Sequence, residues 1–156
     1  MKKRSLLLAV AIAASAWGSA CQALSRSIEI EPVGFIAGKM NLQYEMKTAP
    51  QRSLSLDGAV LWDNQLGKAS YAAVGAGLRR YVAESFQGPW YGGKLQYINW
   101  DENQLVRTSL LGGFKWVGLG SFTQEFFVGA RIDQYLGGND PTQLYPLVGY
   151  SIGYTY

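Results

Sequence analysis

The residues that could carry chemistry in this chain are few. It contains no histidine and a single cysteine, Cys21, so a serine nucleophile would need a lysine or a carboxylate as its base. Ser109 with Lys94 or Lys115 is one such combination, but nothing in the spacing of the sequence selects it. We therefore expect no catalytic residues and predict that the chain is not an enzyme.

Oxygen-rich loops are the remaining candidates for a metal site, because Ca²⁺ needs several oxygen ligands close together. Such groups occur in two short runs, Asp101–Glu102–Asn103 and Asn139–Asp140. Both runs lie where the chain is expected to turn, which favours solvated turn residues over ligands. We expect no metal site and no cofactor.

Most of the sequence alternates between apolar and other residues. The closing segment LVGYSIGYTY has Val148, Tyr150, Ile152, Tyr154 and Tyr156 at every second position, with glycine, serine or threonine between them. A period of two is typical of a β-strand, and seven such segments follow residue 39. No segment of useful length has the 3.6-residue period of a helix, so the sequence predicts an all-β protein.

Charged residues in the middle of these segments decide the architecture. They lie opposite long apolar rows with aromatic flanks, which is the pattern of a barrel with lipid outside and a polar lumen inside. Strands of about 9–11 residues cross a bilayer when tilted, and backbone groups in lipid must all be paired, so the sheet must close. The predicted fold is an all-β, eight-stranded antiparallel up-and-down transmembrane β-barrel over residues 24–156.

The eighth strand is predicted from the strand count and not from a clear alternating pattern. Bacterial single-chain barrels have an even number of strands, and 27–36 is the only candidate for the missing one. It carries Ile28 and Ile30, but Pro32 and Gly34 weaken it. The alternative is one long kinked strand over 27–47, with another crossing elsewhere.

This topology places the turns and the aromatic residues. Turns at 49–52, 85–89 and 118–121 would be periplasmic, and loops at 63–68, 101–104 and 136–143 would lie outside. Two aromatic girdles are then expected: an outer one of Trp62, Tyr71, Trp100 and Tyr145, and an inner one of Tyr81, Trp90, Trp116, Phe122, Tyr154 and Tyr156.

The mid-strand charges are expected to fill the lumen. An eight-stranded barrel is just wide enough to be filled by side chains, and buried charges must be paired. Since the two signs nearly balance, we expect a plug of ion pairs with glycines making room for it, and not an ion channel. The predicted network consists of Glu45, Lys47, Asp57, Lys94, Arg107, Lys115, Glu125, Arg131 and Asp133.

The N-terminus is typical of a secretory signal peptide over residues 1–23. Lys2, Lys3 and Arg4 precede an apolar run of about a dozen residues, which is too short for a helical span of ~20. Cleavage is expected after Ala20 or Ala23, and lipidation of Cys21 is the alternative. Without the three basic residues of the signal the charges balance, and no basic tract indicates nucleic-acid binding.

The signal peptide, the alternating strands and the terminal YSIGYTY together resemble small bacterial outer-membrane β-barrels of the eight-stranded OmpA/OmpX/OmpW-like kind. The stretch PVGFIAGKMNLQYEM is similar to the start of outer-membrane barrels known only as a domain of unknown function. The resemblance implies that the barrel assembly machinery reads the last strand, through Tyr150, Ile152, Tyr154 and Tyr156. It also implies an outer-membrane location, in contact with lipid and lipopolysaccharide.

The predicted function is therefore that of a non-enzymatic outer-membrane barrel with a plugged polar interior and a structural or surface-interaction role. Two alternatives stay open. One is a lipid A- or phospholipid-modifying enzyme, although small outer-membrane barrel enzymes resemble one another in using His, which is absent here. The other is a soluble periplasmic barrel that binds a small ligand.

Overall fold

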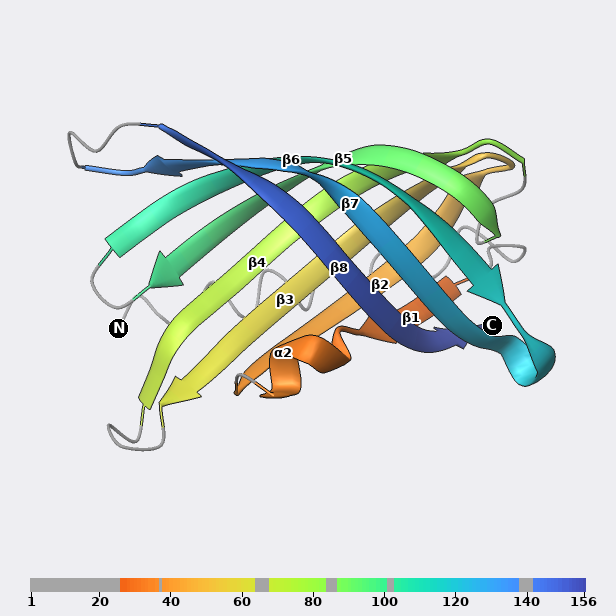
Figure 1. The fold of residues 1–156 in the computed structure, drawn as a ribbon, viewed down its shortest axis with the longest axis horizontal. Coiled ribbons are helices and arrows are strands. Elements are labelled where there is room, and N and C mark those ends of the chain that lie inside the picture. The colour runs from red at the N-terminus through yellow and green to blue at the C-terminus, as the bar shows by residue number, and fades with distance from the viewer. Residues whose placement is uncertain (1–25, 37, 64–67, 84–86, 101–102, 138–141) are drawn as a thin grey trace.

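The chain folds into one closed barrel of eight antiparallel strands in sequence order, seen in a computed structural model (Figure 1). The structure describes residues 26–36, 38–63, 68–83, 87–100, 103–137 and 142–156. The predicted signal peptide, with Cys21, lies outside them. The strands are β1 Arg26–Ile30, β2 Lys39–Ala49, β3 Arg52–Asp63, β4 Lys68–Tyr81, β5 Gly88–Trp100, β6 Asn103–Val117, β7 Phe122–Tyr135 and β8 Gln143–Thr155.

Pairing of β1 with β8 closes the barrel. Beside this ladder, the backbone N–H and C=O groups of Arg26 and Tyr156 exchange two hydrogen bonds of 2.7 Å. The connections between β2 and β3, β4 and β5, and β6 and β7 lie at the end of the barrel that holds the C-terminus. We call this end the short-turn end. It is on the right in Figure 1. The opposite end, where β3–β4, β5–β6 and β7–β8 connect, is the loop end.

The predicted strand at 27–36 is correct only in its first half. Residues beyond β1 form a short helix, α2 Pro32–Ile36, so the prediction of a strand there is wrong. The alternative of a single strand over 27–47 is also wrong, because β1 and β2 are separate antiparallel strands. Proline has its φ preset for the first position of a helix and cannot donate to a sheet ladder. Pro32 therefore ends the strand.

The polarity of the barrel is the reverse of that of a water-soluble domain. Apolar side chains point outward from every strand and are exposed, whereas twelve charged or hydroxyl side chains of the described residues are buried inside. Exposed residues include Leu42, Val74, Tyr97, Leu110, Phe114, Phe126 and Val148. Buried polar residues include Ser27, Glu29, Glu45, Ser53, Ser55, Arg79, Ser109, Lys115, Thr123, Glu125, Asp133 and Ser151.

Two apolar clusters share the interior with these polar groups. One surrounds Ile98 and Leu105 near the loop end, and the other joins Trp90 to Phe127. Gly149 faces Phe127 across the strand pair, where an added Cβ would lie 2.1 Å from the ring. The inward glycines thus leave space for large neighbours, as their position in the pattern predicts. No helix among the described residues is long and apolar enough to cross a membrane.

Candidate functional site: a charged network and a polar cavity inside the barrel

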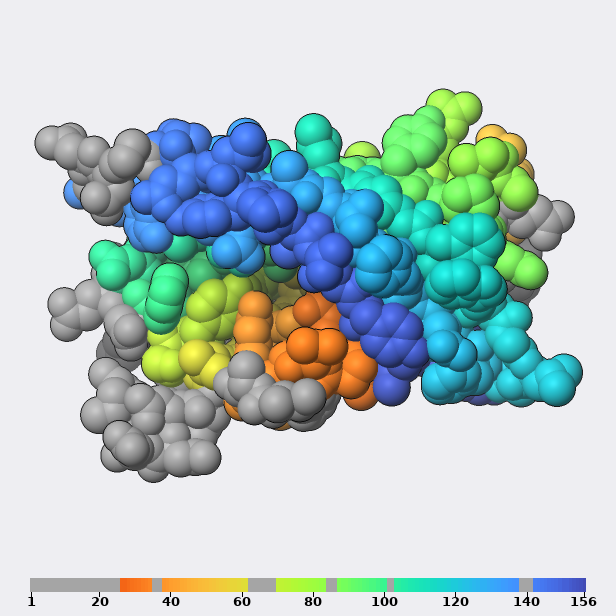
Figure 2. Space-filling view, viewed as in Figure 1, coloured from red at the N-terminus to blue at the C-terminus, as the bar shows by residue number. Residues whose placement is uncertain are grey.

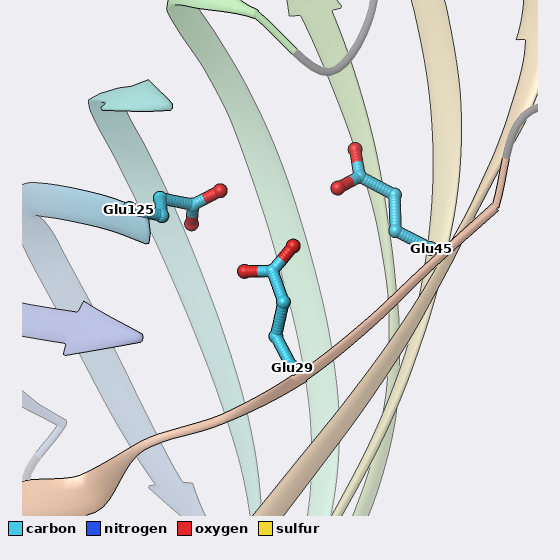
Figure 3. Close-up of side chains that lie close together, drawn as sticks. All are labelled: Glu29, Glu45 and Glu125. Atoms are coloured by element: carbon cyan, nitrogen blue, oxygen red, sulfur yellow. The ribbon is translucent and has the colours of Figure 1, made fainter. Parts of the chain in front are cut away.

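The short-turn half of the barrel interior holds five buried charged side chains. Glu29, Glu45 and Glu125 come from β1, β2 and β7, and their carboxylates point toward one another (Figure 3). Oxygen atoms of the three groups lie within 4.8 Å of one another. The cations between them are Arg79 of β4 and Lys115 of β6. We call these five residues the charged network.

Two cations bridge the three carboxylates. Lys115 Nζ donates to Glu45 Oε2 at 2.7 Å and also pairs with Glu29. Arg79 Nη1 donates to Glu125 Oε2 at 2.7 Å and to Glu45 Oε2 at 3.2 Å. Because all five side chains are buried, each ion depends on these partners in place of water.

Neutral groups complete the shell around the network. Tyr81 Oη donates to Glu45 Oε1 at 2.9 Å, and Ser53 donates to the same oxygen. Ser151 donates to Glu29 Oε2 at 2.6 Å, and the ring of Trp90 lies 4.0 Å from the Arg79 guanidinium carbon. The five charged residues come from five strands, and Ser53, Trp90 and Ser151 of the shell add β3, β5 and β8, so these contacts involve all eight strands.

The network contains three carboxylates and two cations among the described residues. Glu125 Oε1 is the one buried carboxylate oxygen in it with no hydrogen-bond partner. Three converging carboxylates resemble a cation site, but Lys115 and Arg79 already occupy the space between them. A metal ion would have to displace these side chains, so the geometry favours an ion-pair network.

A second set of ion pairs lies nearer the loop end. Arg107 binds Asp133 through two bonds, Nε to Oδ1 at 2.7 Å and Nη2 to Oδ2 at 2.8 Å. Arg131 Nε lies 3.8 Å from the same carboxylate, and Lys94 Nζ lies 3.7 Å from Asp57 Oδ2. The forked Arg107–Asp133 pair has the strong bidentate geometry, whereas the other two contacts are longer.

These ion pairs border a polar cavity of about 90 Å³. Its walls come from all eight strands, and its cations are Lys39, Lys94, Arg107 and Arg131. Four buried atoms on residues that line it have no hydrogen-bond partner within the described chain: Asn41 Oδ1, Asp57 Oδ1, Ser109 Oγ and Arg131 Nε. Groups of this kind normally bind ordered water or a ligand. We call this space the polar cavity.

The predicted lumen residues divide between these two regions. Glu45, Lys115 and Glu125 belong to the charged network, and Asp57, Lys94, Arg107, Arg131 and Asp133 form the second set. Lys47 differs, because it is half-buried and has no ion pair with any described residue.

Two members of the charged network were missed from the sequence. Glu29 lies between Ile28 and Ile30, and Arg79 has the same parity as Gly75 and Gly77, so alternation alone would have placed both side chains inside. Ser109, the candidate nucleophile, makes no hydrogen bond to a lysine. Of the loop residues considered for Ca²⁺, Asn103 begins β6, and the other four lie outside the described residues.

The aromatic girdles were predicted only partly correctly. Tyr71, Tyr81 and Trp90 are buried in the lumen, so their assignment to the girdles is wrong. The girdle residues that are exposed are Trp100, Trp116, Phe122, Tyr154 and Tyr156. The ring centre of Tyr145 lies 5.1 Å from the guanidinium carbon of Arg131. The Trp62 side chain is outside the described part. In the last strand, Tyr150 and Ile152 are half-buried on the same outward row as Tyr154.

Comparisons with protein-family models, curated proteins and solved structures gave no match.

Proposed function

We propose that this chain is an integral outer-membrane β-barrel that does not conduct ions and has a structural or surface-interaction role. The observation that carries the proposal is the reversed polarity of the barrel wall. Exposed aromatic and aliphatic side chains run along every strand while ionised side chains are enclosed. A soluble monomer rarely exposes a contiguous apolar patch of more than a few hundred Å², so hydrocarbon is the solvent that fits this exterior.

The dimensions of the strands support this proposal. From β2 to β8 the strands contain 11 to 15 residues, which is enough to cross a bilayer when tilted. Closure through β1 and β8 pairs the backbone at the short-turn end. The partners that follow are outer-membrane lipid, lipopolysaccharide and the assembly machinery, which would read Tyr150, Ile152, Tyr154 and Tyr156.

The charged network supports the proposal that the barrel does not conduct ions. It spans the lumen with five buried side chains whose charges are held by one another, so a permeating ion would have to break several charge-assisted hydrogen bonds. Within the described part of the chain, Ser109 Oγ has no hydrogen-bond partner that could act as its base.

Membrane extraction with heat-modifiable migration in a denaturing gel tests the placement. We expect the chain to need detergent for extraction, to migrate faster when unheated, and to give no conductance steps in a planar bilayer. Release from the cell envelope in detergent-free buffer would support the soluble alternative and contradict the proposal. If expression of the chain alters the outer-membrane lipids and expression of the Ser109→Ala variant does not, that result would support the enzyme alternative.

A further inference from the structure

The barrel wall is incomplete at one seam near the loop end. β1 pairs with β2 and β8 only as far as Ile30, opposite Leu42 and Ile152. Beyond that point, Lys39–Asn41 of β2 and the part of β8 before Ile152 continue without β1 between them. Because unpaired backbone groups are costly in hydrocarbon, something other than a strand must cover this seam.

The helix α2 lies over the seam. It packs against both β2 and β8, and Figure 1 shows it beside β2, with β8 crossing on its other side. Gly34 lies close to the β2 backbone, since an added Cβ would lie 2.7 Å from the backbone oxygen of Lys39. Just before the helix, Glu31 accepts a hydrogen bond from the side-chain amide of Asn41.

The polar cavity reaches this seam. Its lining includes Ile30, Leu42 and Val148, which belong to the outward apolar rows of β1, β2 and β8. Figure 2 shows the surface hollowed between β8 and the residues of α2 and β2. The cavity is therefore bordered by apolar exterior on one side and by the charged interior on the other.

The charge around the cavity favours an anion. The cavity is lined by four cations, Lys39, Lys94, Arg107 and Arg131, and by three carboxylates, Glu29, Glu31 and Asp57. Lys39 has no ion pair with a described residue and lies 4.6 Å from the centre of the Tyr71 ring. An anionic group bound in the cavity would give Lys39 the charged partner that it lacks among the described residues.

The unpaired polar atoms and the volume of the polar cavity further restrict the chemical class of its ligand. Arg131 Nε and Ser109 Oγ can donate to an oxyanion, while Asn41 Oδ1 and Asp57 Oδ1 can accept from hydroxyl or amine groups. A volume of about 90 Å³ is well below the roughly 300–1,000 Å³ of pockets that enclose drug-sized ligands. It has room for a small head group but not for acyl chains.

We propose that the polar cavity binds the phosphate-bearing head group of a membrane lipid, which enters through the seam between β2 and β8 while its acyl chains stay outside. This inference rests on the proposed membrane placement. The apolar residues at the opening favour a lipid over a soluble anion, because the acyl chains would contact Leu42 and Val148. Lys39 and Arg131 are the side chains that recognise the phosphate.

Native mass spectrometry of the folded chain in a non-ionic detergent tests this proposal with three probes: phosphatidic acid, phosphatidylcholine and glycerol 3-phosphate. We expect phosphatidic acid to bind most tightly. Lys39→Gln and Arg131→Gln should each weaken that binding about tenfold, the effect of losing one charge-assisted hydrogen bond. Lys47→Gln is the matched control, because Lys47 is also half-buried on β2 but does not line the cavity.

A photoreactive phenylalanine analogue at Val148 gives a second measurement. Leu110 on β6 is its control, since both side chains are 70 % exposed but Leu110 lies away from the seam. In vesicles that contain both lipids, we expect the probe at Val148 to enrich phosphatidic acid over phosphatidylcholine relative to the probe at Leu110.

Three results would overturn the inference. The first is equal binding of phosphatidic acid and phosphatidylcholine, and the second is unchanged binding of phosphatidic acid by both Lys39→Gln and Arg131→Gln. The third is binding of glycerol 3-phosphate as tight as that of phosphatidic acid, which would make the cavity a site for a soluble anion. Failure of the proposed function is distinguishable, because a chain that is soluble without detergent fails at extraction, before any lipid is added. Heat-modifiable migration confirms in each case that the variant is folded.

Discussion

Two carboxylates of the charged network have the same burial but opposite surroundings. All four donors around Glu45 point at its oxygens: Ser53 and Tyr81 at Oε1, and Arg79 and Lys115 at Oε2. Glu125 Oε2 accepts from Arg79, but its Oε1 faces no donor among the described residues. Glutamine keeps the shape of glutamate and replaces one oxygen with a donating amide.

The cost of this replacement should therefore differ between the two sites. In Glu45→Gln the amide meets donors whichever way it turns, and two charge-assisted hydrogen bonds of about 1.5–3 kcal/mol each are weakened. We expect a loss of about 3–5 kcal/mol of unfolding free energy, the usual cost of breaking a buried ion pair. In Glu125→Gln the amide can take the place of Oε1 without a clash, and the two cations then face two carboxylates. We expect a change of at most about 1 kcal/mol.

Urea unfolding of the barrel from lipid vesicles, followed by tryptophan fluorescence, measures both values. Lys47→Gln serves as the control for loss of an inward charge outside the network, and it should stay near the parent chain. Equal losses for the Glu45 and Glu125 variants would refute the reasoning, because they would show that the number of donors at each oxygen does not decide the cost.

Three further predictions follow from single positions. Gly129→Ala should prevent folding or remove most folded protein, since its Cβ would lie 2.0 Å from a backbone oxygen, whereas Gly112→Ala, with its nearest atom at 3.7 Å, should fold normally in the same heat-modifiability assay. Arg107→Lys should lose about 1–2 kcal/mol in urea unfolding because lysine cannot form the two-bond fork to Asp133; no loss for Arg107→Lys beside a clear loss for Arg107→Gln would show that the fork adds nothing beyond charge. Tyr156→Ala should reduce assembly in cells but leave refolding in detergent unchanged, and equal loss in both settings would contradict a role in recognition.

The barrel could be predicted from the sequence because its wall obeys one rule along most of its length. Apolar residues at every second position specify the outward face, and this parity also placed the inward charges from Asp57 to Asp133. The same rule places Tyr71 and Tyr81 inside, because they share the parity of Arg79. Only their closeness to the strand ends favours the girdles, and the structure follows parity.

The seam could not be predicted from alternation, because alternation stops there. The apolar residues Ile28 and Ile30 have even numbers, whereas the next one, Val33, has an odd number. Pro32 lies where this parity changes. That break in parity marks the end of β1, but it does not reveal that a helix covers the gap. The pairing within the charged network is also invisible in the sequence, since Arg79 and Lys115 reach carboxylates on strands that are not their neighbours.

The pairing of β1 with β8 has a consequence for the order of events during folding. The contact between Ser151 and Glu29 joins positions 122 residues apart, so the entropy of closing this long loop opposes the final step and makes it slow. Every other strand pair joins sequence neighbours and can form earlier as a hairpin. Until β1 pairs with β8, the nascent sheet has two unpaired edge strands. One of them, β1, has only five residues, so it offers β8 few backbone groups for pairing.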